Sequence, residues 1–225
     1  MGAMEKLSEK ELSLLEKNTL FAGLSKEEER QALEILKARR EDFEKGEMIH
    51  RAGEDMNVFG LVLFGRAEAC MDDFEGNRII MAEVMPGTTF GEALCFLKIH
   101  DSPVYVFAPE DTRLLWLSPE ELFRKAPEDF RLELQRRFSA LLAERTLSMN
   151  SRIQVLSKLR LRDKLITCFS QFSRAAGSDT FLIPMSREDF ARYIGADRSA
   201  LSRELSRMKK EGIIDYYRNT VRILK

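Results

Sequence analysis

The sequence predicts an α+β protein in which a β-rich first half is joined by one long helix to a small helical domain. Short runs of β-branched and aromatic residues alternate with glycines from about Phe43 to Leu117, which is typical of strands and turns. The stretch 128–157 contains neither Gly nor Pro and repeats apolar residues every three or four positions, as a helix does. Two capped helical patterns and two β runs complete the chain. The expected domains are therefore 1–127, 128–157 and 158–225.

Helical patterns precede the β-rich region and extend over residues 8–40. Ser8 followed by Glu11, and Ser25 followed by Glu28, are capping boxes in which each Ser caps a helix start and the Glu returns a hydrogen bond. Apolar residues at helical spacing follow both boxes, so we expect helices at the start of the first domain.

The β-rich region consists of six short runs with a glycine in most of the gaps between them. The runs are Glu47–His50, Val58–Phe64, Ala67–Met71, Arg78–Val84, Pro103–Ala108 and Leu114–Leu117. Gly76 and Asn77 are expected to form a hairpin tip. Many short strands connected by turns indicate an antiparallel sandwich or barrel.

The charge of the chain is unevenly distributed along its length. Residues 158–225 hold 15 Lys/Arg and 8 Asp/Glu, a balance of +7. The chain totals of 36 and 37 leave 21 and 29 for the first 157 residues, a balance of −8. A basic C-terminal third on an acidic body indicates that the C-terminal domain binds a polyanion and the body does not.

Several classes of protein are excluded by composition. The longest apolar runs are broken well before the length of about 18 residues that a membrane span needs, and no apolar signal segment opens the chain. Cys70, Cys95 and Cys168 are too scattered for a disulfide framework, and with only His50 and His100 a histidine-rich metal site is not expected. We expect a cytoplasmic, reducing environment and no membrane partner.

The helical stretch 128–157 is expected to mediate dimerisation. Roughly thirty residues span about 45 Å, more than one face of a small β domain covers. We expect part of the apolar stripe to pack on a second copy of the chain, and packing wholly within one chain is the alternative. The candidate dimer-helix residues are Leu134, Phe138, Leu141, Leu142, Met149 and Ile153.

The C-terminal domain shows the pattern of a helix-turn-helix followed by a β-hairpin. Ser186 caps a first helix that ends at Gly195, where a positive φ is wanted. Asp197 caps a second helix over Arg198–Lys210. Two β runs within Ile213–Leu224 then form a wing, so the segment predicts a winged helix-turn-helix.

The second of these helices carries the candidate DNA-reading residues. Recognition helices contact base edges with their N-terminal residues, where Arg can hold guanine with two hydrogen bonds and Ser can serve base or phosphate. Other basic residues supply charge for phosphates or are simply solvated. The candidate DNA-binding residues are Arg198, Ser199, Ser202, Arg203, Ser186, Arg207 and Arg218.

The order of β domain, long helix and winged helix-turn-helix resembles the CRP/FNR family of bacterial transcription regulators. In the first half the likeness rests on Lys45–Ile49, Gly53 and Glu54, Val62–Ala67, Pro86–Glu92, and Asp111 with Thr112. The resemblance implies a jelly-roll-like β-roll sensor and a homodimer bound to near-palindromic double-stranded DNA, with RNA polymerase as a further candidate partner.

The resemblance also allows a test of the effector. In members that bind cyclic nucleotides, the segment like Phe90–Leu94 is a phosphate-binding cassette, and an Arg about ten residues later neutralises the phosphate. Here Ser102 replaces that Arg and Pro103 the following Ser or Thr. Because a buried phosphate without a cation is costly, we expect neither cyclic AMP nor cyclic GMP. The candidate effector-pocket residues are Gly91, Glu92, Ala93, Leu94, Ser102 and Pro103.

Other family cofactors leave open alternatives. An FNR-type iron–sulfur cluster needs four cysteines and is excluded by three. Haem would need an axial ligand, for which His100, His50 or Cys95 could serve. Cys95 could instead be a redox-sensing thiol or a buried inert one. A different organic ligand, or none, completes the alternatives, and the effector stays unknown.

The recognition helix departs from the family at one base-reading position. The best-studied members carry a Glu at the position of Ser199, which accepts a hydrogen bond from cytosine, whereas Arg203 keeps the guanine-reading Arg. The operator therefore need not follow the family consensus at every base.

The sequence thus predicts a homodimeric, non-enzymatic transcription regulator in which a signal in the β domain shifts how the long helices pack. No nucleophile motif, P-loop or carboxylate cluster with metal spacing supports the alternative of a phosphoester or nucleotide enzyme. A second alternative is a ligand-binding regulatory protein that acts on a protein partner and would show no salt-dependent DNA affinity.

Overall fold

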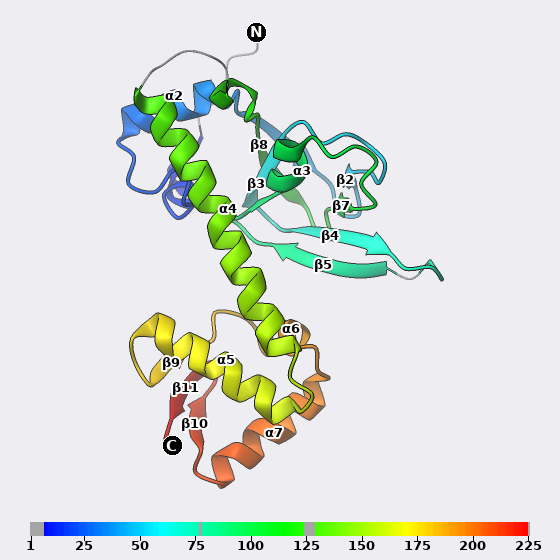
Figure 1. Cartoon of the computed structure of the whole chain (residues 1–225), viewed down its shortest axis with the longest axis vertical. Coiled ribbons are helices and arrows are strands. Elements are labelled where there is room, and N and C mark those ends of the chain that lie inside the picture. Colours follow the sequence, from blue (N-terminus) through cyan, green and yellow to red (C-terminus); the bar gives the residue numbers. More distant parts are fainter. Residues whose placement is uncertain (1–6, 77, 124–128, 225) are drawn as a thin grey trace. The chain divides into compact units, whose positions relative to one another are not determined.

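A computed structural model describes residues 7–76, 78–123 and 129–224 and divides the chain into two compact units, Met1–Ala143 and Glu144–Lys225 (Figure 1). The division falls inside the long helix α4 (Asp129–Leu156). The expected hairpin-tip residue Asn77 and the expected domain boundary at residue 127 lie outside the described residues. Within the described ranges, no helix is both long and apolar enough to cross a membrane.

The first unit opens with two short helices, α1 (Glu9–Leu15) and α2 (Lys26–Ile35), and both predicted capping boxes are confirmed. The expectation of helix up to residue 40 was wrong, because Arg39–Phe43 form strand β1. The chain leaves the helix through Lys37, which has a φ of 47°, and β1 then pairs with β8 (Thr112–Leu117). Cross-strand hydrogen bonds to a distant segment therefore override the local helical preference.

Eight strands form two four-stranded antiparallel sheets, as the predicted sandwich or barrel requires. The sheet orders are β1-β8-β3-β6 and β2-β7-β4-β5. The remaining strands are β2 (Met48–His50), β3 (Phe59–Phe64), β4 (Ala67–Asp72), β5 (Arg78–Val84), β6 (Thr89–Phe90) and β7 (Tyr105–Phe107). Helix α3 (Glu92–Leu97) follows β6, and a 3-10 turn at Glu120–Phe123 follows β8.

The first sheet is buried on both faces, which explains the unbroken apolar run of β3. Val62 and Trp116 pack with Val106 of the other sheet in one core. Leu61 and Leu115 point to the opposite side and join a second core with the helices. Because each face has a cover, β3 shows no alternation of apolar and polar residues.

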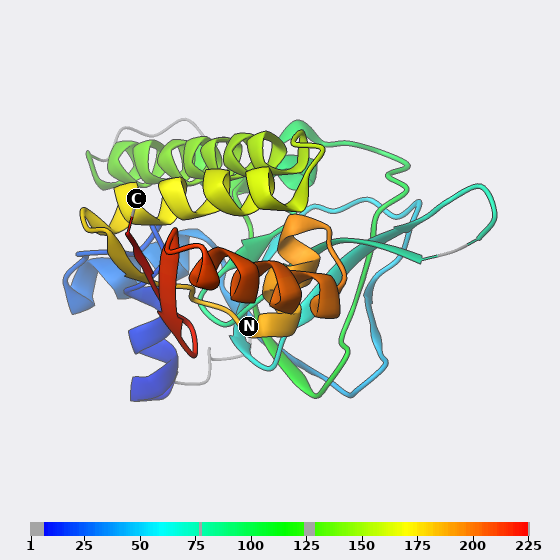
Figure 2. The ribbon, with the colours of Figure 1, turned by 90° about the horizontal axis from the view of Figure 1, so that it is seen from below.

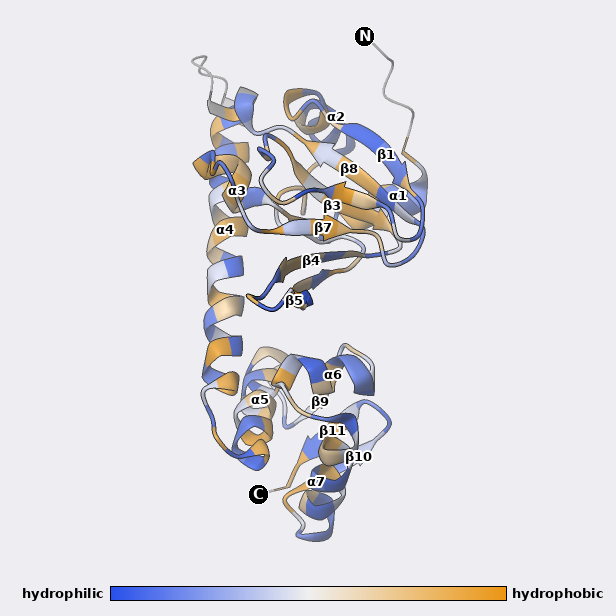
Figure 3. Cartoon of the chain, turned by 90° about the vertical axis from the view of Figure 1, so that its right-hand side faces the viewer, coloured by the Kyte–Doolittle hydropathy of each residue, from blue (hydrophilic) through white to orange (hydrophobic). Residues whose placement is uncertain are grey.

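The N-terminal half of α4 belongs to this second core. Leu134, Phe138 and Leu141 are at most 6% exposed, and the Phe138 ring lies 5.5 Å from that of Phe59 on β3. These three predicted dimer-helix residues are instead buried within their own chain, in the core between the first sheet and its covering helices. Figure 3 shows the N-terminal half of α4 running beside the β-rich first unit. The physical reason is that this face of the sheet is apolar and is covered by α4 together with the N-terminal helical segments of the same unit.

The other candidate dimer residues remain outside this core. Leu142 is half-buried against it, whereas Met149 and Ile153 are 64% and 59% exposed. The apolar stripe of α4 is therefore divided between a self-packed part and an exposed part. Only the exposed part is available to a partner.

The second unit is a compact winged helix-turn-helix (Figure 2). Its helices are α5 (Leu161–Ala176), α6 (Arg187–Ile194) and α7 (Arg198–Lys210), and its strands β9 (Thr180–Leu182), β10 (Ile214–Tyr217) and β11 (Thr220–Ile223) pair in the order β10-β11-β9. The inward-facing residues expected on α6 and α7 are all buried. They are Ala191, Ile194, Leu201, Leu205 and Met208.

Candidate nucleic-acid interface

The turn between α6 and α7 is built as the sequence predicts. Gly195 ends α6 with a φ of 62°, a conformation that favours glycine. Asp197 caps α7 through Oδ1, which accepts hydrogen bonds from the amides of Ser199 (2.8 Å) and Ala200 (3.1 Å). Hydrogen bonds from the Ser199 hydroxyl and from these amides hold the pKa of the Asp197 carboxyl below its usual value. The cap is therefore a carboxylate at neutral pH.

Helix α7 presents one buried and one exposed face. Leu201, Leu205 and Met208 bury one face in the domain core. The opposite stripe, at a spacing of four, seven and eleven residues, consists of Ser199, Arg203, Ser206 and Lys210, all exposed. Arg198 and Ser202 are exposed beside it. The structure thus brings the four predicted base-reading residues to one solvent-facing surface and adds Ser206, which helical periodicity from Ser199 could have found.

The arginines of α7 differ in their local partners. Neither Arg198 nor Arg203 forms an ion pair with an acid among the described residues, whereas Arg207 lies 3.4 Å from Glu204. An arginine without a fixed carboxylate partner keeps its full set of donors for a ligand. Arg203 and Arg198 are therefore the stronger candidates for base contacts, and Arg207 is a weaker one.

An ion-pair network anchors α7 to α5, and sequence reasoning missed it. Arg162 donates from Nε to Glu204 (2.6 Å) and through both terminal nitrogens to Glu211 (2.6 and 3.0 Å). Lys164 donates to the carbonyl of Ile194 at 3.0 Å, near the end of α6. Arg162 lies 42 and 49 positions from Glu204 and Glu211, so no local pattern in the sequence predicts these ion pairs.

The wing is tied to the start of α6. Arg187 donates from Nη2 to the carbonyl of Arg218 at the wing tip (2.7 Å), and its guanidinium lies 5.6 Å from the centre of the Tyr216 ring. Arg218 has a left-handed φ of 52°, and Tyr217 beside it is 74% exposed. The predicted residue Arg218 is therefore at the exposed tip, while Arg187 was missed because its role depends on the folded wing.

Ser186 performs a structural task in this domain. Its Oγ accepts from the amide of Asp189 at 3.1 Å and donates to the Asp189 carboxylate at 2.5 Å. The hydroxyl of this predicted DNA-binding residue is thus engaged in capping α6, and a contact to DNA would have to share it.

The candidate effector-pocket residues surround the start of α3. Gly91 has a φ of 83°, and a Cβ there would lie 2.1 Å from the sulfur of Met56. Glu92 is 6% exposed and accepts a hydrogen bond from the buried Thr89 hydroxyl. These observations favour the expectation that Gly91 and Glu92 serve the turn and its packing. Leu94 is half-buried and Ala93 is exposed.

The position expected to carry a phosphate-neutralising cation holds a small hydroxyl instead. Ser102 is 4% exposed, its Oγ accepts from the amide of Val104 (3.3 Å), and its carbonyl accepts from Gly53 (2.8 Å). Pro103 beside it is exposed. A buried hydroxyl cannot neutralise a phosphate, so the residues present do not fit a cyclic nucleotide.

The candidate haem ligands differ in access. His50 is 8% exposed, its Nε2 has no hydrogen-bond partner, and burial lowers its pKa. His100 is exposed and its Nδ1 lies 2.7 Å from Asp55. Across the described ranges, no group of three or more His, Cys, Asp or Glu side chains is placed to hold a metal.

The Cys95 thiol is expected to react slowly. Burial, and then the charge of Glu92, raise its pKa to about 11, so at pH 7.5 only on the order of one thiol in a thousand or fewer is the reactive thiolate. Alkylation of native protein with iodoacetamide, followed by peptide mass spectrometry, should therefore label Cys95 far more slowly than it does in denatured protein. Cys168, with a pKa raised by burial to about 12, is the matched slow control. Native labelling as fast as in the denatured chain would contradict the burial and restore Cys95 as a redox-sensing candidate.

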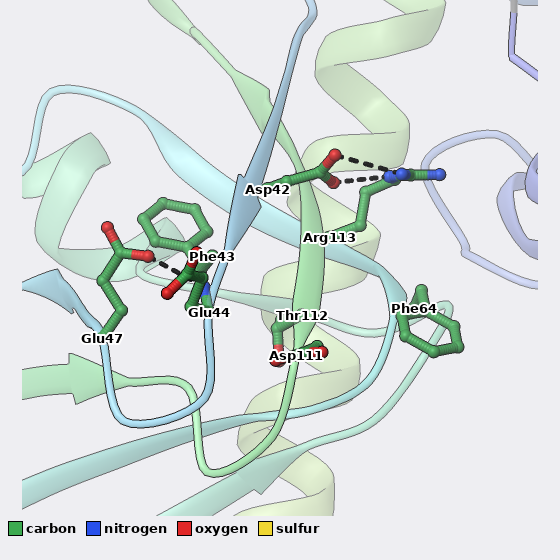
Figure 4. Close-up of a pocket in the computed structure, with 8 residues that line it drawn as sticks. All are labelled: Asp42, Phe43, Glu44, Glu47, Phe64, Asp111, Thr112 and Arg113. Carbon is green, nitrogen blue, oxygen red and sulfur yellow. Dashed lines mark hydrogen bonds and ion pairs between the residues drawn. The ribbon is translucent and has the colours of Figure 1, made fainter.

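A surface pocket of about 590 Å³ lies at one end of the first sheet (Figure 4). Its lining is rich in acids, but several are already engaged within the chain. Asp42 pairs with Arg113 at 2.6 and 3.0 Å, Asp111 accepts from the amide of Lys45, and Glu47 accepts from that of Glu44. The pocket is thus held together by its own hydrogen bonds.

Comparisons with known proteins agree with this architecture. A family model described as cyclic nucleotide-binding domain matches residues 40–128, and one described as Crp-like helix-turn-helix domain matches residues 160–225. A sensor-type β domain followed by a winged helix-turn-helix defines a DNA-binding transcription regulator. The cyclic nucleotide-binding domain comes first and the Crp-like helix-turn-helix domain follows it, and together the two matches cover most of the chain. The chain belongs to the CRP/FNR family of transcription regulators.

Individual relatives are distant but extend over most of the chain. The transcriptional regulatory protein Btr of Bordetella pertussis is 24% identical over 197 residues, which cover 85% of this chain and 80% of the relative. The catabolite activator protein of Thermus thermophilus is 25% identical with a TM-score of 0.51, covering 92% of this chain and 93% of that one. FixK2 of Bradyrhizobium japonicum shares the fold at 21% identity and a TM-score of 0.55, covering 84% and 93%. The predicted fold class and family are confirmed.

Proposed function

We propose that this regulator is a homodimer that binds an inverted-repeat DNA operator through α7 and the wing, under the control of a signal received by its β domain. The observation that carries the proposal is the exposed stripe of α7 with Arg203, whose donors are not paired with an acid among the described residues. The +7 balance of residues 158–225 supplies attraction to the phosphate backbone.

The proposed DNA contacts divide into two kinds. Arg198, Ser199, Ser202 and Arg203 lie in the first half of α7, where recognition helices meet base edges. Arg207, and Arg218 at the wing tip, carry positive charge on exposed positions and contact phosphates in this proposal. Base contacts select the sequence and phosphate contacts set affinity and register.

The proposed dimer rests on the exposed part of α4. Leu142, Met149 and Leu156 follow one another at intervals of seven, and Ile153 falls between the last two at coiled-coil spacing. Met149, Ile153 and Leu156 are 64%, 59% and 41% exposed. Paired helices would bury these side chains, and the two-fold symmetry of such a pair requires a near-palindromic operator.

The proposed effector is a small molecule other than cyclic AMP or cyclic GMP, because Ser102 stands where a cation is needed. Its binding shifts the packing of the two α4 helices and so the positions of the two α7 helices. Contact with RNA polymerase in the cytoplasm is the proposed route to transcription.

Selection from random duplex DNA with the purified protein tests the proposal. We expect enrichment of an inverted repeat whose half-sites lie about one helical turn apart, because one α7 of each protomer reads each half. The logarithm of affinity should fall steeply with the logarithm of salt concentration, since several phosphates are neutralised. No enrichment and no salt dependence would overturn the proposal and favour a regulator that acts on a protein partner.

A further inference from the structure

The hydroxyl of Ser199 is held in one direction. Its Oγ donates to Asp197 Oδ1 at 2.5 Å, and the Ser199 amide donates to the same oxygen at 2.8 Å. An ionised carboxylate accepts hydrogen bonds and donates none, so the direction of the Oγ bond cannot reverse at neutral pH. A serine hydroxyl has a single proton and two lone pairs. With the proton given to Asp197, the exposed side of Ser199 offers only lone pairs.

We propose that Ser199 is an acceptor-only base reader that selects an amino-bearing base, cytosine or adenine, in the operator. In the major groove, only cytosine N4 and adenine N6 present donors, whereas guanine and thymine oxygens accept. A hydroxyl without a free proton makes a favourable hydrogen bond with the first pair of bases and leaves two acceptors facing each other with the second. The inference rests on the proposed DNA binding and adds the specificity of one position.

The neighbouring residues support this assignment. Ser199 is the second residue of α7, within the turn that meets base edges in recognition helices. Arg203 follows one helical turn later on the same exposed stripe and can only donate, which suits guanine. The surface therefore pairs an acceptor with a donor. Because Asp197 takes the hydroxyl proton of Ser199, this serine can only accept hydrogen bonds from a base, as a carboxylate side chain would.

The acceptor role differs from that of the other serine in this half of α7. Ser202 is exposed, and among the described residues no carboxylate is hydrogen-bonded to its hydroxyl. Its proton is therefore not committed to a fixed anion, and Ser202 can donate or accept. Replacing either serine with alanine removes the same hydroxyl group, one helical turn apart. Only Ser199→Ala is expected to remove the dependence of binding on the amino group of a base.

The test combines protein variants with bases that lack the amino group. After operator selection, the position that depends on Ser199 is found as the base pair whose preference Ser199→Ala flattens. At that position cytosine is replaced by 2-pyrimidinone, or adenine by purine, which removes the donor. Wild-type affinity is expected to fall about five-fold, the value of one net hydrogen bond, while Ser199→Ala should lose nothing further. Ser202→Ala is the matched comparison and should keep the full dependence on the amino group.

A second variant separates acceptor character from the mere presence of the hydroxyl. Asp197→Gly removes the carboxylate, and Gly is tolerated at this capping position with little loss of helix stability. The Ser199 proton is then free, so Ser199 can donate as well as accept, and the base preference at its position should flatten although Ser199 is present. Circular dichroism checks that α7 still forms.

The outcomes are distinguishable. No position that Ser199→Ala flattens, or an unchanged wild-type affinity when the amino-bearing base of that pair loses its amino group, overturns this inference while DNA binding stands. An equal loss in wild type and Ser199→Ala on removal of the amino group also overturns it. Failure to select any operator overturns the proposed function itself.

Discussion

Replacing Arg203 with alanine is expected to weaken operator binding by about 1–3 kcal/mol, or roughly 5- to 150-fold, and to relax the preference at one base pair of each half-site. Arg203 is exposed on α7, and among the described residues its guanidinium is not ion-paired, so its paired donors can hold guanine O6 and N7. Losing them removes a base contact and leaves phosphate contacts in place. Competition binding against duplexes varied at each position measures both effects.

The salt dependence of binding provides the check on this assignment. Because Arg203 is expected to read a base, the slope of affinity against salt should stay nearly unchanged in Arg203→Ala. Arg207→Ala is the control, since Arg207 already lies 3.4 Å from Glu204 and is assigned to phosphate. It should weaken binding to all sequences alike and lower the slope by about one. Unchanged operator binding by Arg203→Ala would show that Arg203 reads no base.

Replacing Ile153 with glutamate is expected to separate the dimer. Ile153 is 59% exposed on the part of α4 that does not pack in the core of the first unit, and it lies at coiled-coil spacing from Met149. In a two-fold symmetric dimer, residue 153 of both protomers lies in the contact. Each protomer would lose about 1.5–3 kcal/mol of apolar burial, and two carboxylates would oppose each other. Sedimentation should show a monomer, and operator affinity should fall by about 100-fold or more because each protomer then holds one half-site.

Leu147 provides the matched control on the same helix. It is 66% exposed, comparable to Ile153, but lies outside the seven-residue repeat of Leu142, Met149 and Leu156. Leu147→Glu should therefore leave the dimer and operator binding unchanged. A dimeric Ile153→Glu variant, or equal dissociation of both variants, would place the dimer contact on a different surface.

The helix-turn-helix could be predicted residue by residue because its signals are local. Capping by Asp197, the left-handed Gly195 and the buried spacing of Leu201, Leu205 and Met208 each involve positions within about four residues of one another. The same holds for the two capping boxes of the N-terminal helices. Short-range hydrogen bonds and helical periodicity depend only on residues that are close in the sequence, so they can be predicted from it.

Features that depend on distant partners escaped prediction. The first two residues of β1, Arg39 and Arg40, were expected to be helical, but they join the strand because β8, about seventy residues away, offers a hydrogen-bonding edge. The ion pairs of Arg162 with Glu204 and Glu211 join residues that are 42 and 49 positions apart in the sequence. The sequence around a charged side chain does not show which distant residue it will pair with, so these ion pairs could not be predicted.

The sequence by itself determined the order of domains, the recognition helix, its basic charge and the missing cation at Ser102. Only the tertiary structure decided which part of the apolar stripe of α4 is buried within its own chain. Leu134, Phe138 and Leu141 are buried there, whereas Met149 and Ile153 stay exposed. The physical reason is that apolar periodicity tells which face of a helix avoids water. Which surface covers that face depends on the sheets that fold beside it.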